Sequence, residues 1–326
     1  MIINGDSTEE LKNLLVLDDN LTALKNTPAE SIDLIYLDPP FFSGRDYNVI
    51  WGDKGEVRSF SDRWGDGSEK TGLEIYIAWM EERVREMHRV LKPTGSFYLH
   101  CDWHASHYLK VMCDRVFGYG NFRNEIVWHY RRWSAASRSF QRMHDVIFLY
   151  TKADDYIFNP ILQDYADEKW IEDTVRGVVD GKLVRLKDKD GEYIKRGKEN
   201  KGVMLHDVWE DINFIAPTAK ERVGYPTQKP LALLERIIKA SSNPGDIVLD
   251  PFCGGGTTLV AAAKNNRHYI GIDESVAAIR VSQERLKDHQ GMFEDKYPVV
   301  LGLPHAFDDF NALRSRNPRA VPDEHQ

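Results

Sequence analysis

Residues 246–258 read DIVLDPFCGGGTT, a short apolar run followed by an acid, a proline and three consecutive glycines. Residues 246–249 predict a buried strand and residues 258–264 a helix, so the glycines lie in a strand-to-helix turn. Open α/β sheets bind ligands at this position, and glycine lets a ligand approach the backbone closely. The next predicted strand, 268–272, is followed by Asp273, an acid about 20 residues beyond the glycines that suits the hydroxyl groups of a ribose.

The acid that ends the first of these strands argues against a phosphate ligand. No Gly-Lys-Ser/Thr sequence follows the glycines, and the Asp250 carboxylate would repel a phosphate group. The same carboxylate suits a ligand with a cationic end. S-adenosylmethionine carries such an ammonium, together with a sulfonium and a ribose. A tight turn without a ligand is the alternative, but the strand, the glycines and Asp273 together favour a nucleoside ligand.

Strand-like and helix-like segments alternate on both sides of the glycine turn, which predicts an α/β fold with a mostly parallel sheet covered on both faces. Apolar residues spaced three and four apart predict helices, and short apolar runs predict strands. The further strands are predicted at residues 31–37, 96–100, 124–130 and 145–151. The further helices are predicted at residues 77–91, 108–116, 231–241 and 276–287.

Residues 152–222 interrupt this alternation. They are rich in Lys, Asp, Glu and Gly, with scattered Trp and Tyr, which indicates an inserted small domain of short strands. The predicted organisation is therefore an α/β half over residues 1–151, the insert over 152–222, a second α/β half over 223–290 and a tail over 291–326.

Composition and charge set limits on the class of protein. No run approaches the roughly 20 apolar residues of a membrane span, and the N-terminus lacks the features of a signal peptide. Three scattered cysteines predict neither a disulfide framework nor a metal site, so a cytoplasmic location is expected. The formal net charge is −8, yet residues 123–142 and residues 182–201 each carry a local balance of +4. Such basic segments can bind phosphates on one face of an acidic protein, or they can be solvated loops.

Asp38-Pro39-Pro40-Phe41 also follows a predicted strand, so it should share a sheet edge with the glycine turn. The lone pair of an aromatic amine such as adenine N6 is delocalised into the ring. Hydrogen bonds from the amine to the Asp38 carboxylate and to a backbone carbonyl of the turn would localise that lone pair. The prolines would hold the acceptors rigidly, and Phe41 offers a face for a base to stack on. An ordinary strand-ending turn is the alternative.

These motifs resemble the β-group amino DNA methyltransferases, which modify adenine N6 or cytosine N4. In that group the Asp-Pro-Pro-aromatic motif precedes the glycine motif, with a target-recognition region between them, and the order is the same here. Two further elements resemble the group: residues 225–230, YPTQKP, where Tyr225 replaces the usual His, and residues 4–6, NGD, near the cofactor adenine. The resemblance implies a permuted, Rossmann-like methyltransferase sheet in which residues 1–4 form the third strand by position.

The resemblance also implies the target base. Most cytosine-N4 members carry Ser at the position of Asp38, so Asp38 favours adenine, although most adenine members have Tyr at the position of Phe41. Carbon-5 cytosine methylation needs a nucleophilic cysteine in a Pro-Cys setting, which this sequence lacks. The alternatives are a cytosine-N4 enzyme, an adenine-N6 enzyme acting on RNA, and a non-catalytic DNA-binding subunit. An oxidoreductase on the same sheet would have no use for the Asp-Pro-Pro-Phe sequence.

The sequence therefore predicts an S-adenosylmethionine-dependent DNA adenine-N6 methyltransferase that flips its target base out of duplex DNA. The predicted catalytic residues are Asp38, Pro39, Pro40 and Phe41. The predicted cofactor-binding residues are Asp6, Thr227, Gln228, Lys229, Asp250, Pro251, Phe252, Cys253, Gly254, Gly256, Thr257 and Asp273. The predicted DNA-binding residues, on loops rich in arginine, are Arg45, Arg131, Arg132, Trp133, Arg138 and Arg142. No metal is expected. Double-stranded DNA is the predicted partner. The family resemblance also suggests a cognate restriction endonuclease as a partner, and a homodimer as the assembly.

Overall fold

The computed structural model divides into two compact units, Met1–Asn159 with Asp207–Gln326, and Pro160–His206. The structure describes residues 12–44, 46–50, 56–65, 71–131, 138–163, 170–199, 202–216, 218–225, 227–290 and 299–301.

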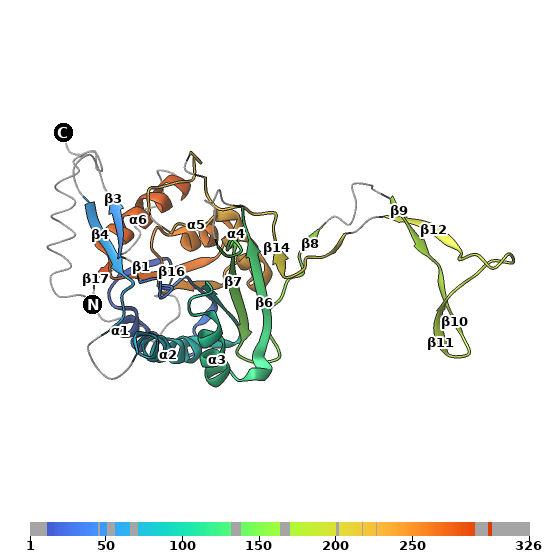
Figure 1. Cartoon of the computed structure of the whole chain (residues 1–326), viewed down its shortest axis with the longest axis horizontal. Coiled ribbons are helices and arrows are strands. Elements are labelled where there is room, and N and C mark those ends of the chain that lie inside the picture. The colour runs from blue at the N-terminus through green and yellow to red at the C-terminus, as the bar shows by residue number, and fades with distance from the viewer. Residues whose placement is uncertain are drawn as a thin grey trace. The chain divides into compact units, whose positions relative to one another are not determined.

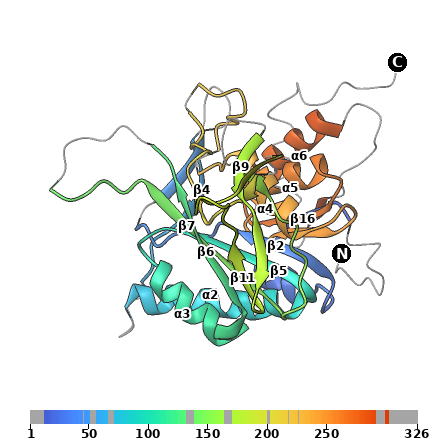
Figure 2. The same ribbon diagram turned by 90° about the vertical axis from the view of Figure 1, so that its right-hand side faces the viewer.

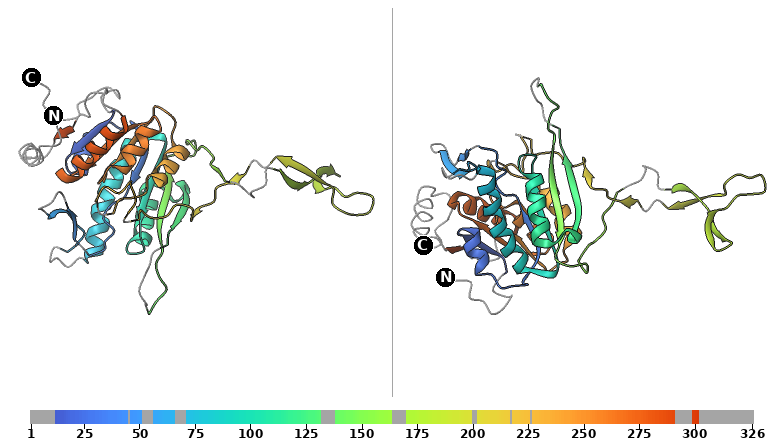
Figure 3. Two further views of the ribbon diagram at one scale, coloured as in Figure 1. Left: turned by 90° about the horizontal axis from the view of Figure 1, so that it is seen from above. Right: turned by 60° about the horizontal axis from the view of Figure 1, so that its bottom comes forward.

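A nine-stranded mixed sheet forms the centre of the larger unit (Figure 1). In spatial order its strands are β14 (Val208–Trp209), β6 (Phe122–His129), β7 (His144–Thr151), β5 (Leu91–Cys101), β2 (Ile32–Leu37), β15 (Ile247–Asp250), β16 (His268–Asp273), β1 (Leu14–Leu17) and β17 (Val299–Leu301). The six strands from β5 to β17 pair in parallel. Strand β7 is antiparallel to both β5 and β6, and β6 and β7 lie side by side in both views of Figure 3.

Parallel pairing brings the carboxyl ends of four strands to one edge of the sheet. Strands β2 and β15 pair in register at Ile35 and Leu249, and β1 and β16 pair as far as Leu17 and Asp273. The residues that leave these strands therefore lie at a common edge, which is where open α/β sheets bind ligands.

Two layers of helices cover the sheet, one on each face (Figures 1 and 2). One layer consists of α1 (Asn20–Lys25), α2 (Gly72–Val90) and α3 (Ser106–Phe117). The other consists of α4 (Leu231–Ser241), α5 (Thr257–Lys264) and α6 (Val276–Gln290). The strands between them are buried on both faces, as expected for parallel strands that run as continuous apolar segments.

Helix α2 shows how local sequence sets these elements. Thr71 and Glu74 form a capping box, in which each side chain accepts the backbone N–H of the other residue. Met80, Val84 and Met87 follow at intervals of four and three and are fully buried, so the apolar face of the helix packs on the sheet.

The α/β alternation predicted from the sequence is confirmed, because every strand and helix of the two halves that was predicted within the described residues has a counterpart in the structure. One helix was predicted too short: α2 runs from Gly72 to Val90 instead of residues 77–91, and β5 begins at Leu91 instead of residue 96. Residues 1–4, predicted as the strand in third position, lie outside the described residues. The strand paired with β16 at that side is β1, which the sequence analysis missed. It also missed a hairpin of the larger unit, β3 (Asp46–Ile50) with β4 (Glu56–Ser61).

The smaller unit consists of short antiparallel pairs. They are β8 (Leu162–Gln163) with β13 (Val203–Met204), β9 (Trp170–Thr174) with β12 (Lys195–Glu199), and β10 (Arg176–Val179) with β11 (Lys182–Arg185). Positive φ angles at Asp180 and Gly181 make the tight turn of the last pair. The unit is narrower than the predicted insert, since residues 152–159 and 207–222 belong to the larger unit. Among the described helices, none is both long and apolar enough to cross a bilayer.

Candidate active site

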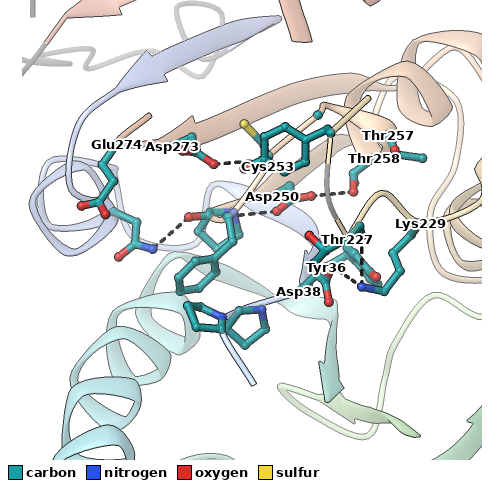
Figure 4. Close-up of a pocket in the computed structure, with 18 of the residues that line it drawn as sticks. Tyr36, Asp38, Thr227, Lys229, Asp250, Cys253, Thr257, Thr258, Asp273 and Glu274 are labelled. Carbon is teal, nitrogen blue, oxygen red and sulfur yellow. Dashed lines mark hydrogen bonds and ion pairs between the residues drawn. The ribbon is translucent and has the colours of Figure 1, made fainter. Parts of the chain in front are cut away.

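The carboxyl edge of the sheet borders a cavity of about 350 Å³. Asp18, Asp38, Asp250 and Asp273 leave β1, β2, β15 and β16, and all four line it. Of the described residues predicted to act in catalysis or cofactor binding, all but Gly256 line this cavity: Asp38, Pro39, Pro40, Phe41, Thr227, Gln228, Lys229, Asp250, Pro251, Phe252, Cys253, Gly254, Thr257 and Asp273. Figure 4 shows side chains from the two halves of the chain facing one another across it.

Asp250 organises the glycine turn from inside. Its carboxylate accepts the backbone N–H of Phe252 at 3.0 Å and the hydroxyl of Thr258 at 2.5 Å. Burial raises the pKa of the carboxyl to about 7, although both hydrogen bonds act to lower it. Asp250 is therefore a buried acid whose negative charge is costly near neutral pH.

Gly256 shapes the turn without lining the cavity. Its φ is 71°, a left-handed conformation that favours glycine, and it is the residue directly before α5, at the N-cap position. A Cβ atom at this position would lie 2.5 Å from the Ser282 hydroxyl oxygen. Gly255, which the sequence analysis left out, does line the cavity.

Asp273 holds the other side of the same turn. Its two carboxylate oxygens accept the backbone N–H groups of Gly254 at 2.9 Å and of Ser275 at 2.8 Å. Burial raises the pKa of Asp273 to about 6, and these two hydrogen bonds limit the rise. Glu274 follows it and also lines the cavity, so a hydroxyl-bearing ligand would meet two adjacent acids.

A third acidic segment at the cavity was missed by the sequence analysis. Asp18, Asp19 and Asn20 follow β1, and all three line the cavity. Asp19 caps the N-terminus of α1, and burial raises the pKa of Asp18. The predicted cofactor residue Asp6 lies outside the described residues. The signal that could have found Asp18 is the apolar run 14–17 followed by acids, since three other strands of this sheet, β2, β15 and β16, also lead to an acid.

The two carboxylate oxygens of Asp38 differ in their hydrogen bonding. Its Oδ2 accepts a hydrogen bond from Lys229 Nζ at 2.5 Å, and Figure 4 shows Lys229 reaching across to it. Its Oδ1 is buried and has no hydrogen-bond partner among the described residues. A buried carboxylate oxygen without a partner is costly, so this atom is ready to accept an N–H group of a ligand. Lys229 Nζ also lies 5.1 Å from the centre of the Phe41 ring.

A buried hydrogen-bond chain supports the tetrapeptide from behind. The Phe41 ring lies 5.9 Å from the His100 ring, His100 Nδ1 bonds to the Tyr36 hydroxyl at 2.8 Å, and His100 Nε2 lies 3.3 Å from Asp145. Burial alone would raise the pKa of Asp145, but the hydrogen bond and charge of His100 lower it overall. Tyr130 donates to Asp145 at 2.8 Å and is buried, so it belongs to the core and is not placed to stack on a base.

Residues 221–225 and 227–229 lie beside the glycine turn and are held by their own hydrogen bonds. The Gln228 side chain accepts the Val223 N–H at 2.9 Å and donates to the Glu221 carbonyl at 2.7 Å, so it holds the loop together. Thr227 has a φ of 65°, which is rare for a β-branched residue and is typical of functional loops. The Tyr225 ring lies so close to Gly254 that a Cβ there would be 2.9 Å from it.

The predicted DNA-binding arginines that the structure describes lie outside the cavity. Arg131, Arg138 and Arg142 are exposed, and the Arg142 guanidinium stacks 3.7 Å from the centre of the Trp103 ring. The other predicted DNA contacts, Arg45, Arg132 and Trp133, lie outside the described residues.

Comparison with known proteins identifies the family of this chain. Residues 32–284 match the model N6_N4_Mtase, described as DNA methylase. The DNA adenine methyltransferase YhdJ of Escherichia coli (strain K12) is 32% identical over 282 residues, which cover 83% of this chain and 82% of YhdJ. The chain belongs to the N6/N4 DNA methylase family. It is a DNA methyltransferase, and its methyl donor is S-adenosylmethionine.

Solved structures agree with the fold of this methyltransferase. TTHA0409 from Thermus thermophilus, complexed with S-adenosyl-L-methionine, has a TM-score of 0.56 at 20% identity and covers 90% of this chain and 100% of its own. The cytosine-N4-specific PvuII DNA methyltransferase has a TM-score of 0.57 at 15% identity, with 93% of each chain covered. At these identities the likeness establishes the mixed α/β fold alone.

The residues at the cavity fit S-adenosylmethionine. Asp273 and Glu274 can accept hydrogen bonds from ribose hydroxyls, and the glycines leave the backbone open to close approach. The costly charge of Asp250 suits the positively charged end of the cofactor. The unpartnered oxygen of Asp38 then remains for a second ligand at the same cavity.

The cysteines of the methyltransferase show no sign of nucleophilic activation. Cys101, Cys113 and Cys253 are buried, and burial raises the pKa of each thiol. A thiol with a raised pKa is a poor nucleophile at neutral pH, which agrees with exclusion of the carbon-5 cytosine reaction. In the part of the chain that the structure describes, no group of three or more His, Cys, Asp or Glu side chains could hold a metal ion.

Proposed function

We propose that this methyltransferase transfers the methyl group to N6 of adenine in duplex DNA after flipping the base out of the helix. The observation that carries the proposal is the buried Oδ1 of Asp38, an acceptor without a partner among the described residues, at a cavity suited to the cofactor. An exocyclic amine supplies the N–H donor that this atom lacks. The base must leave the duplex, because neither its amine nor its face can reach a recessed acceptor from within the stack.

The residues of the tetrapeptide have distinct roles in this proposal. Asp38 Oδ1 and the Pro39 carbonyl accept the two hydrogens of the amine, which localises the nitrogen lone pair for attack on the sulfonium methyl group that S-adenosylmethionine supplies. The Pro40 carbonyl already accepts the Tyr76 hydroxyl at 2.7 Å, which supports Pro39 as the second acceptor. Phe41 offers the stacking face for the base.

Lys229 keeps the negative charge of Asp38 compensated while the site is empty of a base. Its ammonium pairs with Oδ2 and leaves Oδ1 available, so the carboxylate can be buried and still accept a hydrogen bond. This role differs from the cofactor contact predicted from the sequence, although Lys229 lines the same cavity.

Adenine is favoured over cytosine by the acid at the catalytic position. Asp38 stands where most cytosine-N4 enzymes of the group carry Ser, and YhdJ is named an adenine methyltransferase. Amine methylation at cytosine N4 would use the same Asp38 geometry, so it is the second candidate.

The arrangement of the chain supports the finer features of the family. The catalytic strand β2 comes before the cofactor strand β15 in sequence, which is the permuted order, and the unit Pro160–His206 lies between them in the chain. We assign target recognition to this unit together with the basic segment 131–142. A restriction endonuclease and a second copy of the chain remain the partners predicted from the sequence.

The test is methyl transfer from labelled S-adenosylmethionine to mixed-sequence duplex DNA, followed by nucleoside digestion and mass spectrometry. Label in N6-methyladenine is the expected result. Label in N4-methylcytosine would overturn the choice of base and retain the amine chemistry. No label in DNA, with cofactor still bound, would overturn the proposal and favour RNA methylation or a binding subunit.

Replacement of Asp38 by Ala tests the catalytic role directly. We expect turnover to fall by about four orders of magnitude, the scale of losing a principal catalytic group, while the cofactor Kd changes little. Asp33→Ala is the matched control, because Asp33 is a buried aspartate paired with Lys92 at 2.7 Å that does not line the cavity. Equal loss of turnover in the two variants would contradict the role assigned to Asp38.

A further inference from the structure

One face of α2 contacts both halves of the active site. Tyr76, Trp79 and Arg83 are spaced by three and four residues, so their side chains lie on the same side of the helix. Tyr76 is fully buried, and its hydroxyl donates to the Pro40 carbonyl at 2.7 Å. This hydrogen bond fixes the orientation of the peptide at the end of the Asp-Pro-Pro turn.

The other end of this face reaches the cofactor turn through α1. Arg83 donates from Nε to the Asn20 side-chain oxygen at 2.7 Å and from Nη2 to Asp19 at 2.7 Å. The Asn20 amide nitrogen in turn donates to the Pro251 carbonyl at 2.9 Å. Arg83 and Asn20 are both buried, so these bonds are shielded from competing water.

Aromatic packing connects the two ends. The Trp79 ring lies 5.8 Å from the Phe252 ring of the cofactor turn and 5.0 Å from the Trp64 ring, and the Arg83 guanidinium stacks 3.8 Å from its centre. Trp64 also lies 4.9 Å from Tyr76. Side chains therefore form an unbroken series of contacts from Pro40 to Phe252.

Asp62 ties the chain that leaves the tetrapeptide to the same cluster. Its fully buried carboxylate accepts the backbone N–H groups of Phe42 at 3.0 Å and Ser43 at 2.6 Å, and the Trp64 indole N–H at 2.9 Å. Phe42 has a φ of 63°, an unfavourable conformation for this residue that these bonds offset.

We infer that this face of α2 positions the catalytic tetrapeptide and the cofactor turn relative to each other, with Tyr76 and Arg83 as positioning residues. The two loops are more than 200 positions apart in the chain. The amine on one loop and the methyl group on the other must nevertheless meet at about 3–3.5 Å and in line, and a displacement of about 1 Å costs roughly 100-fold in rate. The inference rests on the proposed role of Asp38 in amine methylation.

Tyr76→Phe tests the catalytic end, because it removes only the hydroxyl that holds Pro40. Its matched control is Tyr98→Phe, which removes an equally buried hydroxyl bonded to Ser241 at 2.7 Å, away from the cavity. We expect the single-turnover rate at saturating DNA and cofactor to fall at least about tenfold in Tyr76→Phe and less than about twofold in Tyr98→Phe. Both variants should lose similar thermal stability, and neither Kd should change in Tyr76→Phe.

Arg83→Lys tests the cofactor end. Lysine keeps the charge beside Asp19 but cannot bond Asn20 and Asp19 together as the guanidinium does. We expect the cofactor Kd to rise about tenfold and the single-turnover rate at saturating cofactor to fall, with the DNA Kd unchanged, because the Pro251 peptide loses its support. In the variant that combines Tyr76→Phe with Arg83→Lys, the losses in rate should not be additive, since both act on one distance.

Equal rates for Tyr76→Phe and Tyr98→Phe would overturn the inference, as would a Tyr76→Phe defect confined to either Kd. Strictly additive losses in the combined variant would also count against it. These outcomes differ from failure of the proposed function: if the wild type methylates cytosine, the choice of base is wrong, and the ratio between each variant and the wild type still measures positioning.

Discussion

Replacement of Asp250 by Asn should make the cofactor-free protein more stable at high pH and impair cofactor binding. Burial raises the pKa of Asp250 to about 7 from its ordinary value of 3.8. A rise in pKa of this size corresponds to about 4 kcal/mol. Because the pKa is raised in the folded state, the folded protein holds a proton that the unfolded chain has released between about pH 4 and pH 7. Stability therefore falls as pH rises through this window, and the full penalty applies above pH 7.

Asparagine removes this penalty and can keep the local hydrogen bonds. Its side-chain oxygen can accept the Phe252 N–H, and its amide group can donate to the Thr258 hydroxyl, which turns to accept. We expect Asp250→Asn to be more stable than the wild type by up to about 4 kcal/mol at pH 8, with little difference near pH 4. In a chain of 326 residues each kcal/mol is worth about 1.5 °C in Tm.

Thermal melting from pH 4 to pH 8, with and without S-adenosylmethionine, measures both effects. The cofactor should raise Tm strongly in the wild type at pH 8 and weakly in Asp250→Asn, because the variant lacks the carboxylate that attracts the cationic end. Asp33→Asn is the control, and it should be less stable than the wild type because it removes the negative charge that pairs with Lys92. The electrostatic reasoning is refuted if Asp250→Asn and the wild type lose Tm in parallel as pH rises.

Two further substitutions probe the cavity and the glycine turn beside it. Lys229→Met should lower the free energy of unfolding by about 3–5 kcal/mol and reduce turnover, because it leaves the charge of Asp38 without its ion-pair partner. Combining it with Asp38→Asn should restore the Tm but not the activity. An unchanged Tm in the single variant would show that the pair is not formed in solution. Gly256→Ala should lower the free energy of unfolding by about 1–3 kcal/mol and weaken cofactor binding, because a φ of 71° is unfavourable for alanine and the Ser282 hydroxyl leaves no room for a Cβ. Gly120→Ala is the control, since a Cβ at that position meets nothing within 4 Å. Similar Tm values for both alanine variants would contradict this account.

The fold could be predicted because its elements are long and strongly patterned. Helix α4 was predicted at residues 231–241, its observed bounds, because its apolar spacing is regular and prolines and glycines flank it. The glycine turn and the Asp-Pro-Pro turn could be placed at one edge because both follow buried strands. Parallel pairing then forces their neighbours together, whatever the distance between them in sequence.

The contacts of α2 could not be predicted in the same way. The apolar spacing of Met80, Val84 and Met87 shows which face is buried, but it does not show what that face touches. Tyr76 and Arg83 are polar residues on that face, and their partners, Pro40 and Asn20, belong to distant elements. Strand β1 was missed for a different reason, since four apolar residues next to a loop give too short a pattern to distinguish from a buried turn.

Three of the acids at the cavity, Asp38, Asp250 and Asp273, divide into two electrostatic groups, and this division follows from what each must bind. Asp38 has Lys229 as a permanent counter-charge, so it can remain buried while it awaits a neutral amine. Among the described residues, the partners of Asp250 and Asp273 are N–H and hydroxyl groups, and burial raises the pKa of both acids. A cationic cofactor supplies the charge that these two acids lack, so the same burial that destabilises the empty site strengthens its attraction for S-adenosylmethionine. The acid that meets a neutral base is thus paired with a lysine, whereas the two acids that we assign to the cationic cofactor have no ion-pair partner among the described residues.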